Sequence, residues 1–238
     1  MASTALRMGD HVRVTSTDER LSHVVWYGAG VVGGFLIPFV FSSLLDLHHD
    51  LYYLIYFILV GAFLGAFVRR HSIDLVAFFR QGFLLSLALG VLIAGFLVFN
   101  VLNGDATARP DGAYFAFEVV WRGLIYGAVD ALLLTAFPAL IAFAVIGGTL
   151  TGIGRRLAFA GLVLILTLVI TGAYHLGYEQ YRDDGIGGPE LGNTLISVPT
   201  MLSGNPVGAL IAHSSMHVAA VTHSYETDLY LPPQTEAD

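Results

Sequence analysis

The sequence contains no cysteine and no lysine among its 238 residues. Without cysteine the chain can form neither disulfide bonds nor thiolate metal sites, and it has no cysteine nucleophile. Without lysine it can form no Schiff base, which excludes a retinal-type chromophore and a lysine general base. Charge is also scarce, since 12% of the residues are charged against about 25% in a typical soluble domain. The formal net charge of -7 leaves no basic surface for nucleic acid, so we expect no nucleic-acid partner.

Hydrophobic residues take the place of the missing charge. They make up 55% of the chain, and the mean hydropathy is +0.72. A transmembrane helix needs about 20 consecutive, mostly apolar residues. The sequence therefore predicts an all-α, polytopic transmembrane bundle of about six spans. The predicted spans are roughly 22–45, 51–68, 83–102, 113–147, 157–178 and 206–223.

Two of these stretches depart from a simple span. The fourth is longer than the hydrocarbon core requires, so we expect it to begin at the interface, to tilt, or to kink near Pro138. The region 179–205 is rich in Gly, Asp and Pro, and its apolar piece 194–202 is too short to span, which predicts an interfacial or re-entrant segment. Asn205 and Pro206 then predict the N-cap and first residue of the last span.

The arginines predict the orientation. Positive charge favours the cytoplasmic side of a membrane, and only Arg109 and Arg182 flank the spans on one side. Both termini are therefore expected in the cytoplasm, with a tail at 1–21, a bundle at 22–223 and a second tail at 224–238, in what we expect to be a prokaryotic cytoplasmic membrane. The arginines on the cytoplasmic side are Arg7, Arg13, Arg20, Arg69, Arg70, Arg80, Arg155 and Arg156.

Polar residues inside the spans are the candidate functional residues, because each costs about 2.5–3.5 kcal/mol near the bilayer centre on insertion scales. The predicted helix directions place four of them at similar depth, toward the non-cytoplasmic side. Three further polar residues, His48, His49 and Asp50, lie in the first loop on that side. The four at similar depth are Glu118, His175, His213 and His217.

Spacing suggests how these side chains interact. Glu118 and Arg122 are four residues apart, so they share a helix face and are expected to pair. His213 and His217 have the same spacing, and two such imidazoles can fill two positions of a metal's coordination shell. The glutamate of an HExxH motif is missing between them. Purely structural roles are the alternative. Glu118 and Arg122 would then form an ion pair that holds helices together, His175 would cap its helix, and His213 and His217 would be hydrogen-bonded packing residues.

Other polar and small residues in the spans carry weaker expectations. Asp130 has no obvious partner and is expected to line a water-filled cavity. Two pairs of glycines at four-residue spacing, Gly61 with Gly65 and Gly123 with Gly127, predict close helix packing.

Three segments resemble the CAAX protease and bacteriocin-processing family of intramembrane proteases: Phe117–Gly123, Gly172–His175 and Ala212–His217. The resemblance covers roughly 113–223. It implies that Glu118 activates water, that His175 holds this water, and that His213 stabilises the oxyanion. The sequence departs from the family pattern at three places. Phe117 stands where the family has its first glutamate, Thr171 where it has an aromatic residue four positions before the middle histidine, and His217 where it has the final asparagine.

The sequence thus leaves several functions open. The first is a membrane hydrolase or peptidase with Glu118, His175 and His213 as catalytic residues, and with zinc bound by His175, His213 and His217. The second is a non-catalytic subunit or scaffold that binds a metal or haem through the same histidines. A third is a histidine-zinc hydrolase similar to the adiponectin-receptor and hemolysin III group, suggested by the HxxxH helix and Asp130. Expected partners are membrane lipids, a peptide or lipid-like substrate, and a homo-oligomer or membrane complex.

Overall fold

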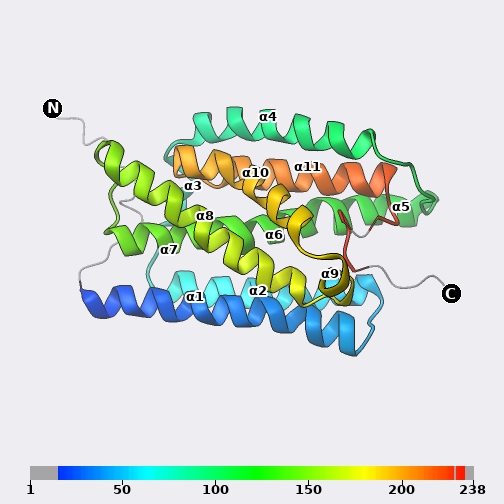
Figure 1. Cartoon of the computed structure of the whole chain (residues 1–238), viewed down its shortest axis with the longest axis horizontal. Helices are drawn as coiled ribbons and strands as arrows, with labels where there is room; N and C mark the ends of the chain where they lie inside the picture. The colour runs from blue at the N-terminus through cyan, green and yellow to red at the C-terminus, as the bar shows by residue number, and fades with distance from the viewer. Residues whose placement is uncertain (1–15, 228, 234–238) are drawn as a thin grey trace.

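The computed structural model describes residues 16–227 and 229–233, in which all regular secondary structure is helical. The long helices lie side by side and form one bundle (Figure 1), so the predicted all-α fold is confirmed. In chain order the elements, with η denoting π-helical segments, are α1 (Thr17–Pro38), η1 (Phe39–Leu44), α2 (His49–Arg70), α3 (Leu75–Arg80), α4 (Phe83–Leu102), α5 (Gly112–Glu118), η2 (Val119–Ile125), α6 (Tyr126–Ala131), η3 (Leu132–Ala136), α7 (Phe137–Ile146), α8 (Gly152–Leu176), α9 (Glu179–Asp184), α10 (Gly187–Ser203) and α11 (Val207–His223).

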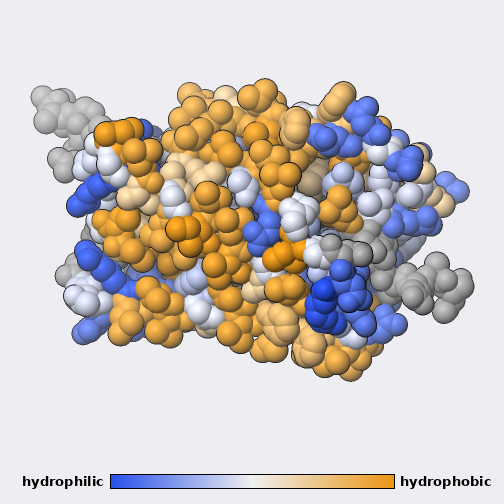
Figure 2. All heavy atoms as spheres, viewed as in Figure 1, coloured by the Kyte–Doolittle hydropathy of each residue, from blue (hydrophilic) through white to orange (hydrophobic). Residues whose placement is uncertain are grey.

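The bundle has the surface of an integral membrane protein. Figure 2 shows apolar residues over the middle of the visible face and hydrophilic residues gathered toward its two ends. Within the described ranges, five helices are long and apolar enough to cross a membrane. The sixth predicted span forms α11, a helix of 17 residues. The five are Thr17–Leu44, His49–Arg70, Phe83–Leu102, Gly112–Ile146 and Gly152–Leu176.

The first helix begins earlier than hydropathy predicts. Its N-cap is Ser16, whose side chain accepts a hydrogen bond from the Glu19 backbone, while the Glu19 carboxylate accepts one from the Ser16 backbone. This reciprocal capping box starts a helix without any apolar residue. Helix α1 therefore begins at Thr17 rather than near Ser22. Most of the predicted tail, residues 1–15, lies outside the described residues.

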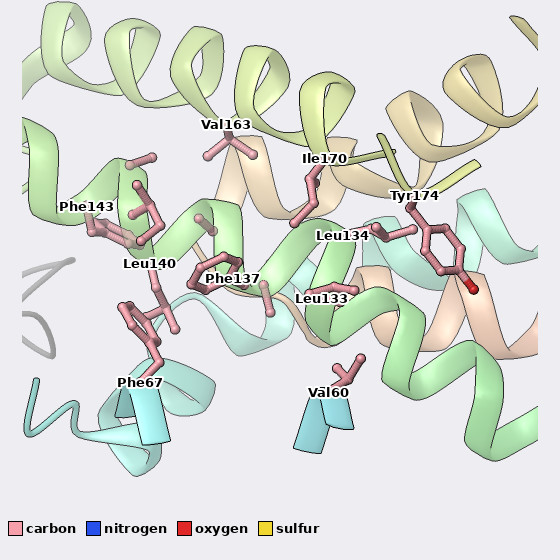
Figure 3. Packing of buried hydrophobic residues seen from close by; sticks show 14 of the residues in the cluster. Val60, Phe67, Leu133, Leu134, Phe137, Leu140, Phe143, Val163, Ile170 and Tyr174 are labelled. Atoms are coloured by element: carbon pink, nitrogen blue, oxygen red, sulfur yellow. The ribbon is translucent and has the colours of Figure 1, made fainter. Parts of the chain in front are cut away.

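The apolar core fills the space between α2, the η3–α7 segment and α8. Figure 3 shows Phe67 of α2 pointing toward Leu140 and Phe137, and Val60 of α2 pointing toward Leu133, so that the η3–α7 segment lies between α2 and α8. Phe67 and Phe137 meet edge to face, with ring centroids 5.0 Å apart. Ile170 of α8 closes this core from the other side.

The fourth stretch is one continuous helix from Gly112 to Ile146 with two π-helical segments, η2 and η3. A π-helix bonds each N–H five residues back rather than four, which adds a residue to the turn. Pro138 sits in the first turn of α7, immediately after η3. The irregularity expected at this proline thus takes the form of a π-helical segment placed before it.

The region predicted to be a loop with a short apolar piece is instead a full helix. Helix α10 runs for 17 residues, from Gly187 to Ser203, and includes both Pro189 and Pro199. Pro189 lies in the first turn, where its missing N–H leaves no bond unmade. The predicted apolar piece 194–202 is therefore the C-terminal half of a longer helix. The prediction was too short because the N-terminal half of α10 is polar but helical.

This extra helix reverses the direction of α11. The Asn205 Nδ2 donates hydrogen bonds to the carbonyls of Phe79 at 2.8 Å and Gln81 at 2.7 Å, at the turn before α4. At its other end, the His223 Nε2 lies 3.1 Å from the Gly104 carbonyl, in the loop after α4. Helix α11 therefore starts at the end of the bundle where most arginines lie, which we call the arginine-rich end. The arginines at this end are Arg20, Arg69, Arg70, Arg80, Arg155 and Arg156.

The residues after α11 are a packed segment rather than a free tail. Leu231 is fully buried, and the Tyr53 hydroxyl donates a 2.7 Å hydrogen bond to the Pro232 carbonyl. We call residues 224–227 and 229–233 the C-terminal segment. It lies at the arginine-poor end, opposite Thr17 (Figure 1). The expectation that the chain returns to the cytoplasm after its last span is therefore not met by the described residues.

Single cysteines test this topology, and the cysteine-free chain is a clean background. Asp105→Cys and Glu226→Cys should react with an impermeant maleimide from one side of the membrane, and Arg156→Cys from the other. All three positions are exposed, and the first two lie at the arginine-poor end. The wild-type chain should not react. Labelling of Glu226→Cys from the same side as Arg156→Cys would contradict the described direction of α11.

Candidate functional site

The buried polar residues of the bundle form two groups. The Asp130 cluster consists of Asp130 on α6 with His213 and His217 on α11. The Glu118 cluster consists of Glu118 with His49, Asp50 and Tyr225, and of Tyr114, which bonds to Asp50. Glu118 and Asp130 lie on the same long helix, but their partners differ, and the two groups are described in turn.

Gly127 brings the Asp130 cluster together. A Cβ at this position would lie 2.6 Å from the Ser214 Cα and 3.0 Å from the His217 ring, so only glycine fits against α11 here. The Ser214 hydroxyl fastens the crossing by donating a 3.2 Å hydrogen bond to the Leu124 carbonyl. Close packing at Gly123 and Gly127 was predicted from their spacing and is confirmed. The other predicted pair, Gly61 and Gly65, faces open space.

The three side chains of the Asp130 cluster offer converging ligand atoms. The His213 Nε2 lies 3.8 Å from the Asp130 Oδ2, and one ligand atom from each residue lies within 4.8 Å of the others. All three residues are at most 5% exposed. Among the described residues, the His213 Nδ1 has no hydrogen-bond partner, and the His217 ring, which lies near the Tyr230 backbone, forms no hydrogen bond of standard geometry. Buried imidazole nitrogens without partners are costly, which identifies this position as one suited to a ligand.

Asp130 is held from its other side by a network of buried tyrosines. The Tyr56 hydroxyl donates a 2.5 Å hydrogen bond to the Asp130 Oδ1. The hydroxyls of Tyr126, Tyr174 and Tyr178 form a chain beside it, with separations of 2.9 and 2.6 Å. Such a second shell fixes the orientation of the carboxylate and leaves Oδ2 to face the histidines.

A cavity of about 290 Å³ adjoins the Asp130 cluster. His175 also borders it, but His175 is not in the convergent set, and its Nδ1 lies 2.9 Å from the Thr171 carbonyl. Asn193 of α10 forms part of the same wall and donates a hydrogen bond to the Thr171 hydroxyl. His175 thus lines the cavity beside the three possible ligands without belonging to their set.

The Glu118 cluster lies where the C-terminal segment meets α2 and α5. The Glu118 side chain is fully buried, its Oε2 accepts a 2.9 Å hydrogen bond from the Tyr225 hydroxyl, and the His49 Nε2 lies 3.5 Å away. The Tyr114 hydroxyl similarly donates to the Asp50 Oδ2 at 2.9 Å. Burial raises the pKa of Tyr225 to about 12, so its hydroxyl remains a donor at neutral pH.

Glu118 and Arg122 do not form the predicted ion pair within the described part of the chain. The helix becomes π-helical at Val119, and its wider turn removes the register on which a four-residue pairing depends. Arg122 is fully buried and donates instead to the Leu231 and Pro233 carbonyls, at 2.5 and 3.3 Å, and to the Tyr53 hydroxyl at 3.2 Å.

The structure therefore divides the predicted site. His213 and His217 are together, His175 borders the same cavity, and Glu118 has no contact with any of them but pairs with Tyr225 and His49. The predicted common depth rested on the wrong direction for α11. Asp130 lines a cavity, as predicted, but its convergence with His213 and His217 was not predicted. Its signal was its position three residues after the packing glycine Gly127, on the helix face that meets α11.

A second group of metal-ligand type, His48, His49 and Asp50, lies at the N-terminus of α2. His48 is exposed there, and its Nδ1 accepts a hydrogen bond from the Asp50 backbone as the helix N-cap. This contact explains His48 as a capping residue.

Comparison of the chain with protein-family models, with curated proteins and with solved structures gives no match. The resemblance to the CAAX protease family stays a prediction. The site is therefore interpreted from its own geometry.

Tyr225→Phe tests how the C-terminal segment is attached. The change removes the hydrogen bond to buried Glu118, and leaving such an acceptor without a donor costs about 1–3 kcal/mol. We expect a lower thermal unfolding midpoint in detergent. Tyr230→Phe, in the same segment, is the matched control and should change the midpoint less. Equal midpoints for Tyr225→Phe and the wild type would contradict the described contact.

Proposed function

We propose that this membrane protein binds Zn²⁺ through Asp130, His213 and His217 and hydrolyses a substrate held in the adjoining cavity. One observation carries the proposal: three metal-ligating side chains from two helices converge in a buried position at the inner end of a cavity. The buried imidazole nitrogens without hydrogen bonds of standard geometry support it.

The donor set suits zinc. Two imidazoles and a carboxylate are ligands of catalytic Zn²⁺ sites, with ligand atoms about 2.0–2.2 Å from the ion. Tetrahedral ligands at these distances lie about 3.3–3.6 Å apart, and the 3.8 Å between the His213 Nε2 and the Asp130 Oδ2 is close to this separation. Three protein ligands leave the fourth tetrahedral position for water. Because the cavity adjoins the three ligands, it leaves room there for water or substrate.

The chemistry is that of a zinc hydrolase. Zinc lowers the pKa of bound water to about 7 and so supplies hydroxide at neutral pH. Held by Asp130, His213 and His217, the ion would supply hydroxide for attack on a substrate carbonyl carbon, and the leaving group would take the proton that the water gives up. His175, which borders the cavity outside the ligand set, is placed to carry that proton.

This proposal differs from the two main sequence hypotheses. Glu118 is not proposed as the general base, because its carboxylate contacts Tyr225 and His49 instead of the three histidines. Haem is not the first proposal, because His213 and His217 stack on one helix face with ring centroids 4.8 Å apart, so a haem would need His175 opposite one of them and would leave Asp130 without a role. The arrangement favours the histidine-zinc hydrolase interpretation, with Asp130 as the third ligand.

Metal analysis tests the proposal. Protein purified without chelator should contain about one equivalent of zinc, as expected for a single three-ligand site. Asp130→Asn and His217→Ala should each weaken zinc binding by more than about 100-fold, since even second-shell changes cost about 10–100-fold. Both variants should also lose zinc-dependent ester or amide hydrolysis.

Glu118→Gln is the matched control, since it alters a buried carboxylate of the same long helix outside the Asp130 cluster. It should retain zinc. A wild-type protein that binds no zinc, or a Glu118→Gln protein that loses zinc as Asp130→Asn does, would refute the proposed site. A haem absorption band in the purified protein would refute it in favour of the non-catalytic alternative.

A further inference from the structure

The cavity beside the Asp130 cluster opens to the side of the bundle. Its inner wall holds buried residues, whereas its outer rim includes Phe96 of α4, Leu191 of α10 and Leu229 of the C-terminal segment. These three rim residues are 52%, 64% and 45% exposed. The opening thus lies between α4 and α10, where the two helices pack against each other.

The exposed rim of this opening is largely apolar, with Asn100 of α4 as a polar lining residue. Helix α4 is one of the five helices long and apolar enough to span the membrane. Exposed side chains on the flank of such a helix contact hydrocarbon. A large apolar side chain such as Leu191 or Phe96 at the rim is therefore in its preferred environment, and a molecule that enters here comes from within the bilayer.

The interior has the polarity of an amphiphile. Much of the wall is apolar and includes Leu97, Leu195 and Ile196, while Asp130, His213 and His217 are its buried polar end. Further polar lining residues include Asn100, His175 and Asn193. The cavity volume of about 290 Å³ is too small for a transmembrane peptide helix, whose diameter with side chains is about 10–12 Å. This volume and this lining suit part of a single hydrocarbon chain.

We propose that the cavity takes one acyl chain of a membrane lipid, which enters between α4 and α10 and places its reacting group at the Asp130 cluster. This inference deepens the proposed function, on which its chemical part rests: the substrate of the hydrolase is a lipid ester or amide. Binding of the chain does not require the metal and can be tested separately.

Gly192 gives a way to close the opening. It borders the cavity on α10, and a Cβ there would meet nothing within 4 Å. Gly192→Phe therefore places a ring in the passage without displacing backbone. Gly187 is the matched control: it lies on the same helix, a Cβ there also meets nothing within 4 Å, and it is not part of the cavity wall.

The experiment is photo-crosslinking in nanodiscs that contain phosphatidylcholine with a diazirine on one acyl chain. Mass spectrometry should find label on Met216, a cavity residue only 8% exposed. Gly192→Phe should reduce this label by about tenfold, because the ring would occupy space that the acyl chain needs and overpacking is unfavourable. Gly187→Phe should leave it unchanged.

Two results would overturn the inference. The first is wild-type protein with label only on lipid-facing residues such as Leu92 and none on Met216. The second is equal labelling of Met216 in the wild type and in a folded Gly192→Phe protein. The wild-type result needs no variant, so a misfolded Gly192→Phe protein does not prevent the test.

Zinc content measured on the same samples separates the two proposals. Label on Met216 without zinc supports binding of the acyl chain and refutes the proposed zinc hydrolase. Zinc without label on Met216 supports the metal site and overturns the lipid inference.

Discussion

Helix α11 lies closer to its neighbours than side chains normally permit, and both of the buried polar groups depend on it. Gly127 lets it touch α6 at Ser214, and on its other flank a Cβ at Gly90 of α4 would lie 2.3 Å from the Gly208 Cα. Backbone contacts of this kind drive helix association in lipid, where hydrophobic burial contributes little. Because α11 is held on both flanks, His213 and His217 have a fixed depth opposite Asp130, and the C-terminal segment leaves the helix beside Glu118.

The fold could be predicted where it follows from hydropathy and not where it follows from contacts. Five apolar runs became helices because a chain in lipid must satisfy its backbone internally. The helix Gly187–Ser203 was missed because its first half, with Gly188, Pro189, Glu190 and Asn193, has the composition of a loop. Its polar face is buried in the bundle: Asn193 bonds to Thr171 of α8, and the Ser197 hydroxyl lies 3.0 Å from the Thr135 hydroxyl. No pattern within the segment reports those partners.

The same missed helix explains most of the error at the site. With α11 reversed, Glu118 no longer shares a depth with His213, and the residue opposite the histidines is Asp130. A π-helical turn after Glu118 then separates it from Arg122, a change that no rule of four-residue spacing anticipates. The histidine pair itself was predicted correctly as a unit, because a spacing of four places both rings on one face whichever way the helix runs.

The position of Arg122 in the chain has a consequence for biosynthesis. Its guanidinium bonds to the carbonyl of Leu231, 109 residues later in the chain, and the bond from Tyr53 to Pro232 spans 179 residues. The fourth helix is therefore synthesised before the Leu231 and Pro233 carbonyls that Arg122 binds, and of its partners only the Tyr53 hydroxyl of α2 precedes it in the chain. Membrane insertion and completion of the bundle are thus separate events in time, and the interval between them is set by the translation of α8, α10 and α11.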